Sequence, residues 1–505
     1  MKGPVFMRRF GSQGFLEAVK YTAGCGGGLL LKVLITSAAT YLRIPLRFSY
    51  LIAAISLLFF SFFFHRQITF RSQTRNGKGS VLRDFALYVP GVLAFKVLDY
   101  VLVVMAASAL RRYLQNSTEL TLTWIQLINT SCIFSSSAVL FTLRFFVYKV
   151  IFHKWSEADL DYYTGKTVSV FEGYSARNEI AANAASGGFV TGMLTHLLES
   201  GKIDGALVSR LEVDKGEIAP VTEIVTDPSE LTRFQGSIYM SYPLLSAETL
   251  DKIHAFSGHL AIVALPCQCR GIRKRLENDP ALQGRPIFLI GLFCGHTSQP
   301  ALLDRVLERK KIRKKEIRSF RFRRGLGRGY SEIVLCDGTR ITFPSAAYLL
   351  YQNLFVEAAP QCTACFDHFA EAADLACGDV WTWRHRRDKI KHSIFCSRTD
   401  AGEEALQEAI RAGCFVVEKS DRVRLLRANI RAAIYHKAIA ARAEAAARYG
   451  KNLPVPPLAR PSRWNERLAA RLIARLNRKQ PERILKMNRR YLKILLYIFK
   501  GLTNF

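Results

Sequence analysis

Four cysteines have the side-chain type and the spacing to carry chemistry in this 505-residue chain. Cys267 lies in L-P-C-Q-C, Cys294 in G-L-F-C-G-H, and Cys362 and Cys365 in C-T-A-C. Thiolates are soft ligands that suit zinc ions and iron–sulfur clusters, although a lone C-x-x-C also occurs as a redox pair or by chance. Zinc ribbons usually carry two C-x-x-C pairs about 15–20 residues apart, and here the second pair is missing. The set therefore favours an iron–sulfur site over zinc.

The segments around these cysteines predict an α/β domain. From about residue 167, short apolar runs such as 260–265 and 286–292 alternate with helical patterns such as 188–198 and 268–276. Cys267 and Cys294 each follow an apolar run, and ligands gather at strand ends in an α/β sheet. Cys269 and Cys377 lie close to the predicted site without a defined role. The remaining cysteines read as small buried hydrophobic residues: Cys25, Cys132, Cys336, Cys396 and Cys414.

The first 155 residues contain four long apolar stretches, at about 15–42, 48–64, 85–110 and 122–151. Each is long enough to cross a hydrocarbon core of roughly 30 Å, which needs about 20 residues. The sequence therefore predicts an all-α transmembrane four-helix bundle; the alternative is a set of buried core helices. Basic residues concentrate between the second and third stretches, which predicts a multi-pass protein of the inner (cytoplasmic) membrane with both termini in the cytoplasm.

The last 85 residues form a basic tail. Residues 421–505 hold 21 Lys and Arg against 4 Asp and Glu, which supplies +17 of the formal net charge of +31. Apolar residues recur at helical spacing among these cations, as in helices that lie on an anionic lipid surface. Packing onto the protein itself is the alternative, and no nucleic-acid motif is present. The predicted architecture is multi-domain: a transmembrane bundle (1–155), an α/β cytoplasmic domain (156–420) and a basic amphipathic helical tail (421–505).

The α/β part carries several stretches that occur together in a known family. They are A-S-G-G-F-V-T-G-M-L-T-H-L-L-E-S-G-K-I-D-G (185–205), L-P-C-Q (265–268), G-L-F-C-G-H (291–296), C-T-A-C (362–365) and A-D-L-A-C-G-D-V-W (373–381). In order and spacing, residues 174–383 resemble the coenzyme F-420 hydrogenase/dehydrogenase beta-subunit family of flavin- and iron–sulfur-dependent reductases. The resemblance implies a [4Fe–4S] cluster on Cys267, Cys294, Cys362 and Cys365.

The same resemblance implies a flavin, either FAD, FMN or a deazaflavin, at the turn Ser186-Gly187-Gly188. Small residues that open a helix let backbone N–H groups approach a phosphate, although Ser186 as a plain helix cap explains the turn equally well. Asp374 and Asp379 are expected to orient the cofactor or to be ordinary turn residues.

Two positions depart from the family pattern. Gly295-His296 reverses the usual His-Gly, and Ile238 stands where a Lys is common. His296 is expected to act as a proton donor or to be a structural histidine.

The N-terminal part resembles the GtrA-like family of four-span proteins, on F-F-F-H-R-Q-I-T-F (62–70) and R-F-F-V-Y-K (144–149). That family is associated with surface-glycan synthesis and the movement of polyprenyl-linked sugars. Together the two resemblances imply a membrane-anchored oxidoreductase of polysaccharide biosynthesis, fed by a ferredoxin-like donor. The alternative is a non-catalytic transport or assembly factor for lipid-linked sugars, in which the cluster is structural. Nucleic acid is not expected as a partner.

Overall fold

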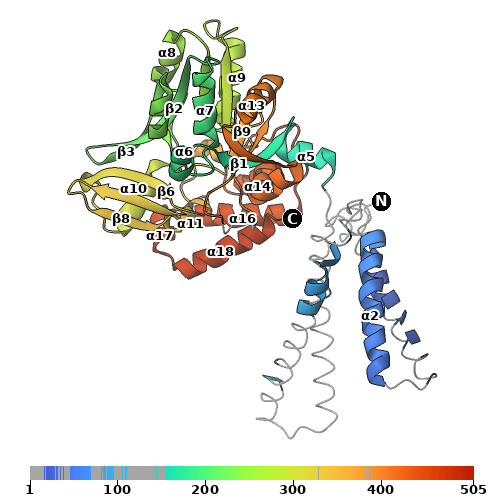
Figure 1. The fold of residues 1–505 in the computed structure, drawn as a ribbon. Helices are drawn as coiled ribbons and strands as arrows, with labels where there is room; N and C mark the ends of the chain where they lie inside the picture. The colour runs from blue at the N-terminus through green and yellow to red at the C-terminus, as the bar shows by residue number, and fades with distance from the viewer. Residues whose placement is uncertain are drawn as a thin grey trace. The chain divides into compact units, whose positions relative to one another are not determined.

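The computed structural model describes residues 155–504 except 328, 383, 386 and 387, the segment 46–69, and single residues and short segments elsewhere between 16 and 144. The chain divides into two compact units, Met1–Ser156 and Glu157–Phe505 (Figure 1).

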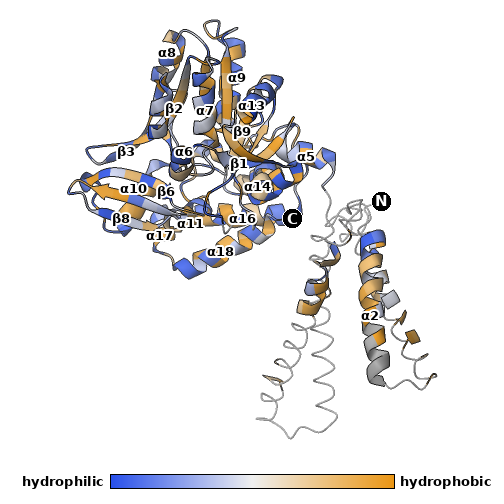
Figure 2. Ribbon diagram, viewed as in Figure 1, coloured by the Kyte–Doolittle hydropathy of each residue, from blue (hydrophilic) through white to orange (hydrophobic). Residues whose placement is uncertain are grey.

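The described part of the first unit centres on one apolar helix. Helix α2 (Leu46–Phe64) continues into a π-helical turn, η1 (His65–Thr69), and Figure 2 shows apolar residues along α2. Phe62 forms a buried cluster with Tyr21 and Tyr88. Next to this cluster, burial lowers the pKa of His65 to about 4.

The predicted transmembrane architecture and membrane location are wrong. Across the part of the chain that the structure describes, no helix is both long enough and apolar enough to span a lipid bilayer. Most of the fourth predicted stretch and about half of the third lie outside the described residues. An apolar run shows that side chains avoid water, but it does not show whether lipid or protein surrounds them, and this ambiguity misled the prediction.

The second unit is built on an eight-stranded mixed sheet with the strand order β11-β1-β10-β9-β5-β4-β2-β3. The strands are β1 (Val170–Ser175), β2 (Gly205–Asp214), β3 (Glu217–Val225), β4 (Leu260–Ala264), β5 (Ile287–Leu292), β9 (Leu375–Asp379), β10 (Ser393–Ser397) and β11 (Phe415–Lys419). The four central strands, β9, β5, β4 and β2, run parallel to one another. The remaining pairs are antiparallel: β3 with β2 on one side, and β10 with β9, β1 with β10 and β11 with β1 on the other. The predicted α/β domain is thus confirmed, and the C-terminal ends of its parallel strands meet at one edge.

Helices cover this sheet because its strands are apolar on both faces. Helix α7 (Phe189–Glu199) and α13 (Asp400–Arg411) bury residues in one cluster with Phe171, Phe395 and Phe415 of the sheet. The other helices before residue 421 are α5 (Glu157–Thr164), α6 (Asn178–Asn183), α8 (Ala247–Ala255), α9 (Pro266–Asn278), α10 (Pro300–Arg309), α11 (Ala346–Gln352) and α12 (Pro360–Thr363), with 3-10 turns η3 (Pro228–Phe234) and η4 (Lys314–Glu316).

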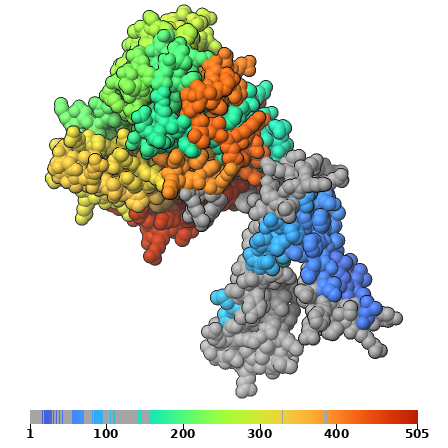
Figure 3. All heavy atoms as spheres, viewed as in Figure 1, coloured from blue at the N-terminus to red at the C-terminus, as the bar shows by residue number. Residues whose placement is uncertain are grey.

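A second, smaller sheet and the C-terminal helices share another core. The strands β6 (Ile317–Arg324), β7 (Tyr330–Leu335) and β8 (Arg340–Pro344) form an antiparallel sheet. The tail folds into α14 (Arg422–Lys437), α15 (Ile439–Ala447), α16 (Trp464–Asn477), α17 (Pro481–Lys486) and α18 (Arg489–Leu502). Ile473, Leu492 and Phe499 of the tail are buried in one cluster with Phe320 and Ile333 of the small sheet. In Figure 3 the red C-terminal helices accordingly lie against the yellow region of β6–β8.

Candidate functional site

The four predicted cysteines reach one place from three segments of the chain. Cys267 lies in the first turn of α9, just after β4, and Cys294 lies two residues after β5. Since β4 and β5 are parallel neighbours, their ends bring these two cysteines to the same edge of the sheet. Cys362 is in the short helix α12 and Cys365 follows it. Together with His296 and Thr297, all four cysteines line a cavity of about 250 Å³.

The spacing of the four thiols is wider than a single zinc ion requires. Around tetrahedral zinc, with Zn–S bonds near 2.3 Å, the sulfurs lie about 3.8 Å apart. Among the residues that the structure describes, only His385, Asp388 and His392 form a group of three or more such side chains with ligand atoms all within 4.8 Å of one another. No three of the four thiols meet that distance.

Desolvation favours the protonated form of the four thiols. Desolvation, followed by the thiols of Cys365 and Cys362, raises the pKa of Cys267 to about 11. Desolvation likewise raises the pKa of each of the other three thiols. Binding of a metal centre must displace these protons, so the thiolates form only when the metal binds.

Arg442 of α15 anchors the loop that carries the C-x-x-C pair. Its Nη1 donates to the carbonyl of Thr363 at 2.7 Å, and its Nη2 donates to the carbonyl of Cys365 at 2.5 Å. Nη2 also donates to the carbonyl of His436 at 2.7 Å. The residue is only 5% exposed. No carboxylate among the described residues lies within ion-pair distance of Arg442. Its surroundings are backbone carbonyls, the ring of Tyr435, whose centroid lies 5.3 Å from the guanidinium carbon, and the thiols of Cys362 and Cys365.

An uncompensated buried guanidinium fits an anionic cluster. A buried charge is costly unless it is paired, and four thiolates around an iron–sulfur core would supply the missing negative charge. The backbone N–H of Thr297 also donates to the sulfur of Cys362 at 3.4 Å, which stabilises a thiolate in the same way. The donor set, the spacing and the charge of the residues present therefore fit a [4Fe–4S] cluster.

Three neutral histidines hold the segment that contains Cys294. His368 donates from Nδ1 to the carbonyl of Cys294 at 2.9 Å, and His436 donates from Nε2 to the carbonyl of Gly295. His296 donates from Nε2 to the carbonyl of Gln352 at 2.6 Å. Burial lowers the pKa of His296 to about 4, that of His436 to about 4 and that of His368 to about 3. At neutral pH the one ring proton of His296 is thus held by Gln352, and its Nδ1 is left as an acceptor.

A larger cavity of about 800 Å³ adjoins the thiol cavity. Cys294, His296, Thr297 and His436 line both cavities. A volume of this size lies within the range of about 300–1,000 Å³ that is usual for cofactor sites. Helix α14 of the tail forms one wall, and Ile238 is part of the lining.

The predicted glycine turn borders this larger cavity through Ser186 and Gly188. Gly188, at φ +80°, is the residue that precedes helix α7, so Ser186 is not the helix cap. The hydroxyl of Ser186 instead donates to the carbonyl of His392 at 3.0 Å. Gly187 is required by packing, because an added Cβ would lie 2.5 Å from the carbonyl oxygen of Gly173. Its N–H donates to Ser393 Oγ at 2.9 Å and is therefore already used.

The two predicted aspartates occupy different environments. Asp374 lines neither cavity; its carboxylate accepts hydrogen bonds from the N–H of Leu289 at 2.8 Å and from Arg273 and Thr399. Asp379 lies at the end of β9, lines the larger cavity and pairs with Arg323 at 2.6 Å. The structure therefore places Asp374 in the scaffold and Asp379 in the cavity wall.

Several residues of the site were not predicted from the sequence: Arg323, His368, His436 and Arg442. Arg323 is 6% exposed, and its Nε is buried without a hydrogen-bond partner. It supplies a basic group to the cavity in which Ile238 replaces the usual Lys. Cys269, whose role was open, is fully buried and donates its thiol to the carbonyl of Ala264 at 3.7 Å. Cys377 lines the larger cavity.

Comparison with family models places this region in a known group. Residues 170–248 match the N-terminal part, and residues 258–423 the C-terminal part, of the coenzyme F420 hydrogenase/dehydrogenase beta subunit. The resemblance inferred for the α/β domain is thereby confirmed, as is the prediction of an oxidoreductase domain. The comparisons give no support to the GtrA-like resemblance, a membrane anchor or a role in glycan synthesis.

Individual proteins that are similar to this chain carry names from the same group. The coenzyme F420-dependent sulfite reductase of Methanocaldococcus jannaschii is 29% identical over 250 residues, which cover 46% of this chain and 35% of the relative. The coenzyme F420 hydrogenase subunit beta of Methanosarcina barkeri is 26% identical, over 52% of this chain and 86% of the relative. A chain of the solved F420-reducing [NiFe] hydrogenase complex from that organism superposes with a TM-score of 0.44 at 21% identity, covering 58% of this chain and 98% of that one.

Proposed function

We propose that residues 157–504 form an electron-transferring oxidoreductase unit, in which a [4Fe–4S] cluster on Cys267, Cys294, Cys362 and Cys365 works beside a flavin in the larger cavity. The two matched halves of the beta subunit at residues 170–248 and 258–423 are the premise of this proposal. When bound, the cluster supplies single electrons and the flavin couples them to two-electron chemistry.

The observation that carries the proposal is the shared wall between the two cavities. Cys294 and its neighbours His296 and Thr297 line both, so a centre on the four thiols and a ring system in the larger cavity would be separated by only one layer of residues. The hydrogen bonds from His368 and His436 to this segment fix that layer. A thiol site with a purely structural role would not need to border a cavity of cofactor size.

The chain's own residues would bind and orient the two groups. Arg442 and the N–H of Thr297 stabilise negative charge on the thiolates. The N-terminus of α7 at Gly188 and the basic side chain of Arg323 offer positive ends to a phosphate or another anionic part of the flavin. His296, whose Nε2 is held by the backbone carbonyl of Gln352, would be part of the wall between the two groups.

The electron partners follow from the chemistry of the relatives. Because the relatives above are named as dependent on coenzyme F420, we propose a deazaflavin or a related flavin as the two-electron partner. The matched hydrogenase subunit belongs to a protein complex, so a protein electron carrier of the ferredoxin class is the proposed one-electron partner.

The test is anaerobic purification of the full chain, followed by an absorbance spectrum and assays of iron, zinc and flavin. We expect about four irons per chain and a flavin that is released on denaturation. Substitution Cys362→Ser should remove the cluster absorbance, whereas Cys336→Ser, at an exposed cysteine outside the site, should leave it unchanged.

Two results would contradict the proposal. Colourless protein that contains zinc would show a structural metal site, and an unchanged spectrum in Cys362→Ser would refute the ligand set. Cluster absorbance without any bound flavin would instead favour the assembly factor with a structural cluster.

A further inference from the structure

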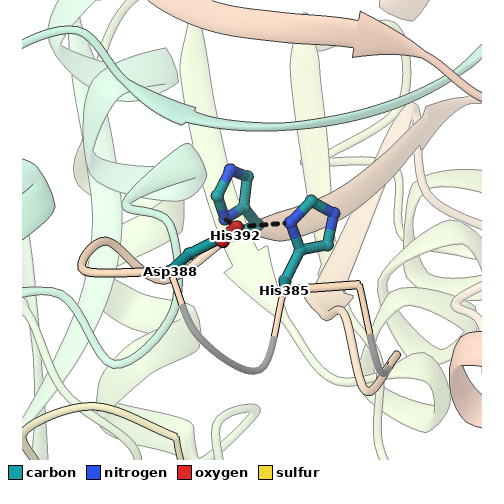
Figure 4. A group of neighbouring side chains, drawn as sticks. All are labelled: His385, Asp388 and His392. Atoms are coloured by element: carbon teal, nitrogen blue, oxygen red, sulfur yellow. Dashed lines mark hydrogen bonds and ion pairs between the residues drawn. The ribbon is translucent and has the colours of Figure 1, made fainter.

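A separate group of potential metal ligands lies in the loop between β9 and β10. None of its three side chains lines the thiol cavity or the larger cavity. His385, Asp388 and His392 form the sequence H-x-x-D-x-x-x-H. Their ligand atoms all lie within 4.8 Å of one another, as for no other such group in the described residues. Figure 4 shows the three side chains converging, with the hydrogen bond between His385 and Asp388 dashed.

The two imidazoles share one carboxylate. Nδ1 of His385 lies 2.7 Å from Oδ2 of Asp388, and Nδ1 of His392 lies 3.5 Å from the same oxygen. The two rings stack with centroids 4.1 Å apart and an interplanar angle of 23°. The three ligand atoms therefore lie close together around one carboxylate oxygen.

Two further observations fit a cation at this point. Nδ1 of His392 is buried, and its contact with Asp388 Oδ2 at 3.5 Å lacks hydrogen-bond geometry, which is unusual for a buried polar atom. His385 lies between two carboxylates, because its Nε2 is 3.1 Å from Oε2 of Glu172 while its Nδ1 meets Asp388. A neutral imidazole has one proton and satisfies only one of these contacts, so the second requires a metal ion or a second proton.

Glu172 is suited to orient a metal ligand. Its carboxylate is 1% exposed and also accepts from Ser420 Oγ at 3.0 Å and from Arg424 Nη2 at 2.6 Å. Metal-binding histidines usually donate their other ring N–H to such a fixed carboxylate. When Nε2 of His385 donates its proton to Glu172, Nδ1 carries the lone pair of the ring, and Nδ1 faces Asp388.

We propose that His385, Asp388 and His392 bind one divalent first-row transition-metal ion of the Zn²⁺ class, through two imidazole nitrogens and one carboxylate oxygen. Imidazole and carboxylate ligands suit such ions, and three protein ligands leave a position for water. The side chain of Asp388 is 37% exposed, which keeps that position open to solvent. The neighbouring cations Arg384 and Arg424 are paired with Glu418 and Glu172, so the carboxylate of Asp388 remains for the ion.

The site would support the turn at the larger cavity. The carbonyl of His392 accepts from Ser186 Oγ, and the next residue, Ser393, accepts from the N–H of Gly187. A metal ion on His392 would therefore fix the start of β10, against which the Ser186–Gly188 turn rests. This inference goes beyond the proposed redox function, since the metal site can be present or absent independently of the cluster.

The test is equilibrium dialysis of the anaerobically purified full chain against Zn²⁺, with zinc and iron measured per chain. We expect one zinc per chain in addition to any iron. Substitutions Asp388→Asn and His392→Ala should each weaken zinc binding at least about tenfold. His254→Ala is the matched control, because His254 also pairs with an aspartate, Asp279, at 3.2 Å and should leave binding unchanged.

Cobalt separates this site from the cysteines. Co²⁺ on nitrogen and oxygen ligands lacks the intense thiolate charge-transfer absorption, so its binding without that absorption supports the proposal. Zinc binding that is equal in all variants, absent in the wild type, or accompanied by the thiolate band of Co²⁺ would overturn it. Because the side chain of Asp388 is 37% exposed, Asp388→Asn keeps the test valid should His392→Ala fail to fold, and circular dichroism checks both.

Discussion

Arg442 donates a hydrogen bond of 2.5 Å to the backbone carbonyl of Cys365, 77 residues earlier in the chain. This contact joins the basic tail to the cysteine site. It places a buried positive charge beside the second thiol of the C-x-x-C pair, where no carboxylate of the described residues neutralises it.

The first prediction concerns the charge of Arg442. Substitution Arg442→Gln should lower the reduction potential of the bound cluster, on the order of 50 mV, because loss of a nearby cation favours the oxidised, less negative state. Arg442→Lys should keep most of the potential but lose the forked hydrogen bonds, and hence stability. Potentiometric titration followed by EPR measures the first effect, and urea unfolding measures the second.

Arg448→Gln is the control for this pair, since Arg448 is an exposed residue at the end of the same helix. An equal shift of potential in Arg448→Gln and Arg442→Gln would show that only the overall charge of the tail matters.

The second prediction concerns the glycine turn. Gly187→Ala should lower the free energy of unfolding by about 1–3 kcal/mol, because the new Cβ would meet the backbone of Gly173 and Ser393. Gly188→Ala should also destabilise the fold, because Gly188 has φ +80° and the new Cβ would lie 2.9 Å from the side chain of Ile180. Both variants should bind flavin more weakly. Urea unfolding and flavin titration are the measurements.

Gly201→Ala is the control that separates backbone strain from a steric clash. Gly201 follows helix α7 at φ +68°, and an added Cβ would meet no atom within 4 Å. This variant should lose only about 1–2 kcal/mol of unfolding free energy, because alanine disfavours the left-handed backbone conformation, and its flavin affinity should be unchanged. Weakened flavin binding in this variant as well would count against a specific role for the turn.

The third prediction contrasts the two aspartates. Asp374→Asn should lower the free energy of unfolding by about 2–4 kcal/mol, since it weakens a buried acceptor of three hydrogen bonds, one of which is the ion pair with Arg273. Its flavin affinity should be unchanged in the folded protein. Asp379→Asn should have the opposite profile, with weaker flavin binding and a smaller loss of stability, because Asp379 lines the cavity. Loss of flavin affinity in Asp374→Asn alone would reverse this assignment.

The fourth prediction is a pH dependence of stability from Glu403. Burial opposes ionisation, but hydrogen bonds from Ser169, Ser397 and Gln407 outweigh it and lower the pKa of Glu403 below its usual 4.5. The folded state thus binds its proton less readily than the unfolded state, so the stabilisation is complete above that value and is lost as the pH falls through the lower, folded pKa. Glu403→Gln should lack this part of the acid loss. Urea unfolding between about pH 3 and pH 6 measures it, and identical pH profiles for the two proteins would contradict it.

The cysteine site was largely predictable because ligand chemistry resides in residue type and order. Cys267 and Cys294 follow apolar runs that become the adjacent parallel strands β4 and β5, and parallel strand ends necessarily share an edge. Likewise, the alternation of apolar runs with helical patterns was sufficient to predict an α/β sheet.

The sequence misled where one pattern fits two environments. The apolar stretches before residue 155 suggested membrane spans, yet no helix in the described part of the chain meets the length and hydropathy that a span needs. In the tail, Leu492 and Phe499 have the spacing of a lipid-facing helix, but they are buried against the small sheet. Hydropathy records avoidance of water and does not identify what replaces the water.

The sequence by itself indicated that four cysteines come together, that the second unit is of the α/β class, and that residues 170–423 resemble the coenzyme F420 hydrogenase/dehydrogenase beta subunit, because these depend on residue identity, periodicity and order. Only the tertiary structure decided which polar residues serve those cysteines. Arg442 and His436 lie in an Ala- and Arg-rich helical stretch that resembles an exposed helix, and Asp374 has the same local sequence character as Asp379. Their roles depend on which segment packs over them, since burial and hydrogen-bond partners are set by contacts between residues far apart in the chain.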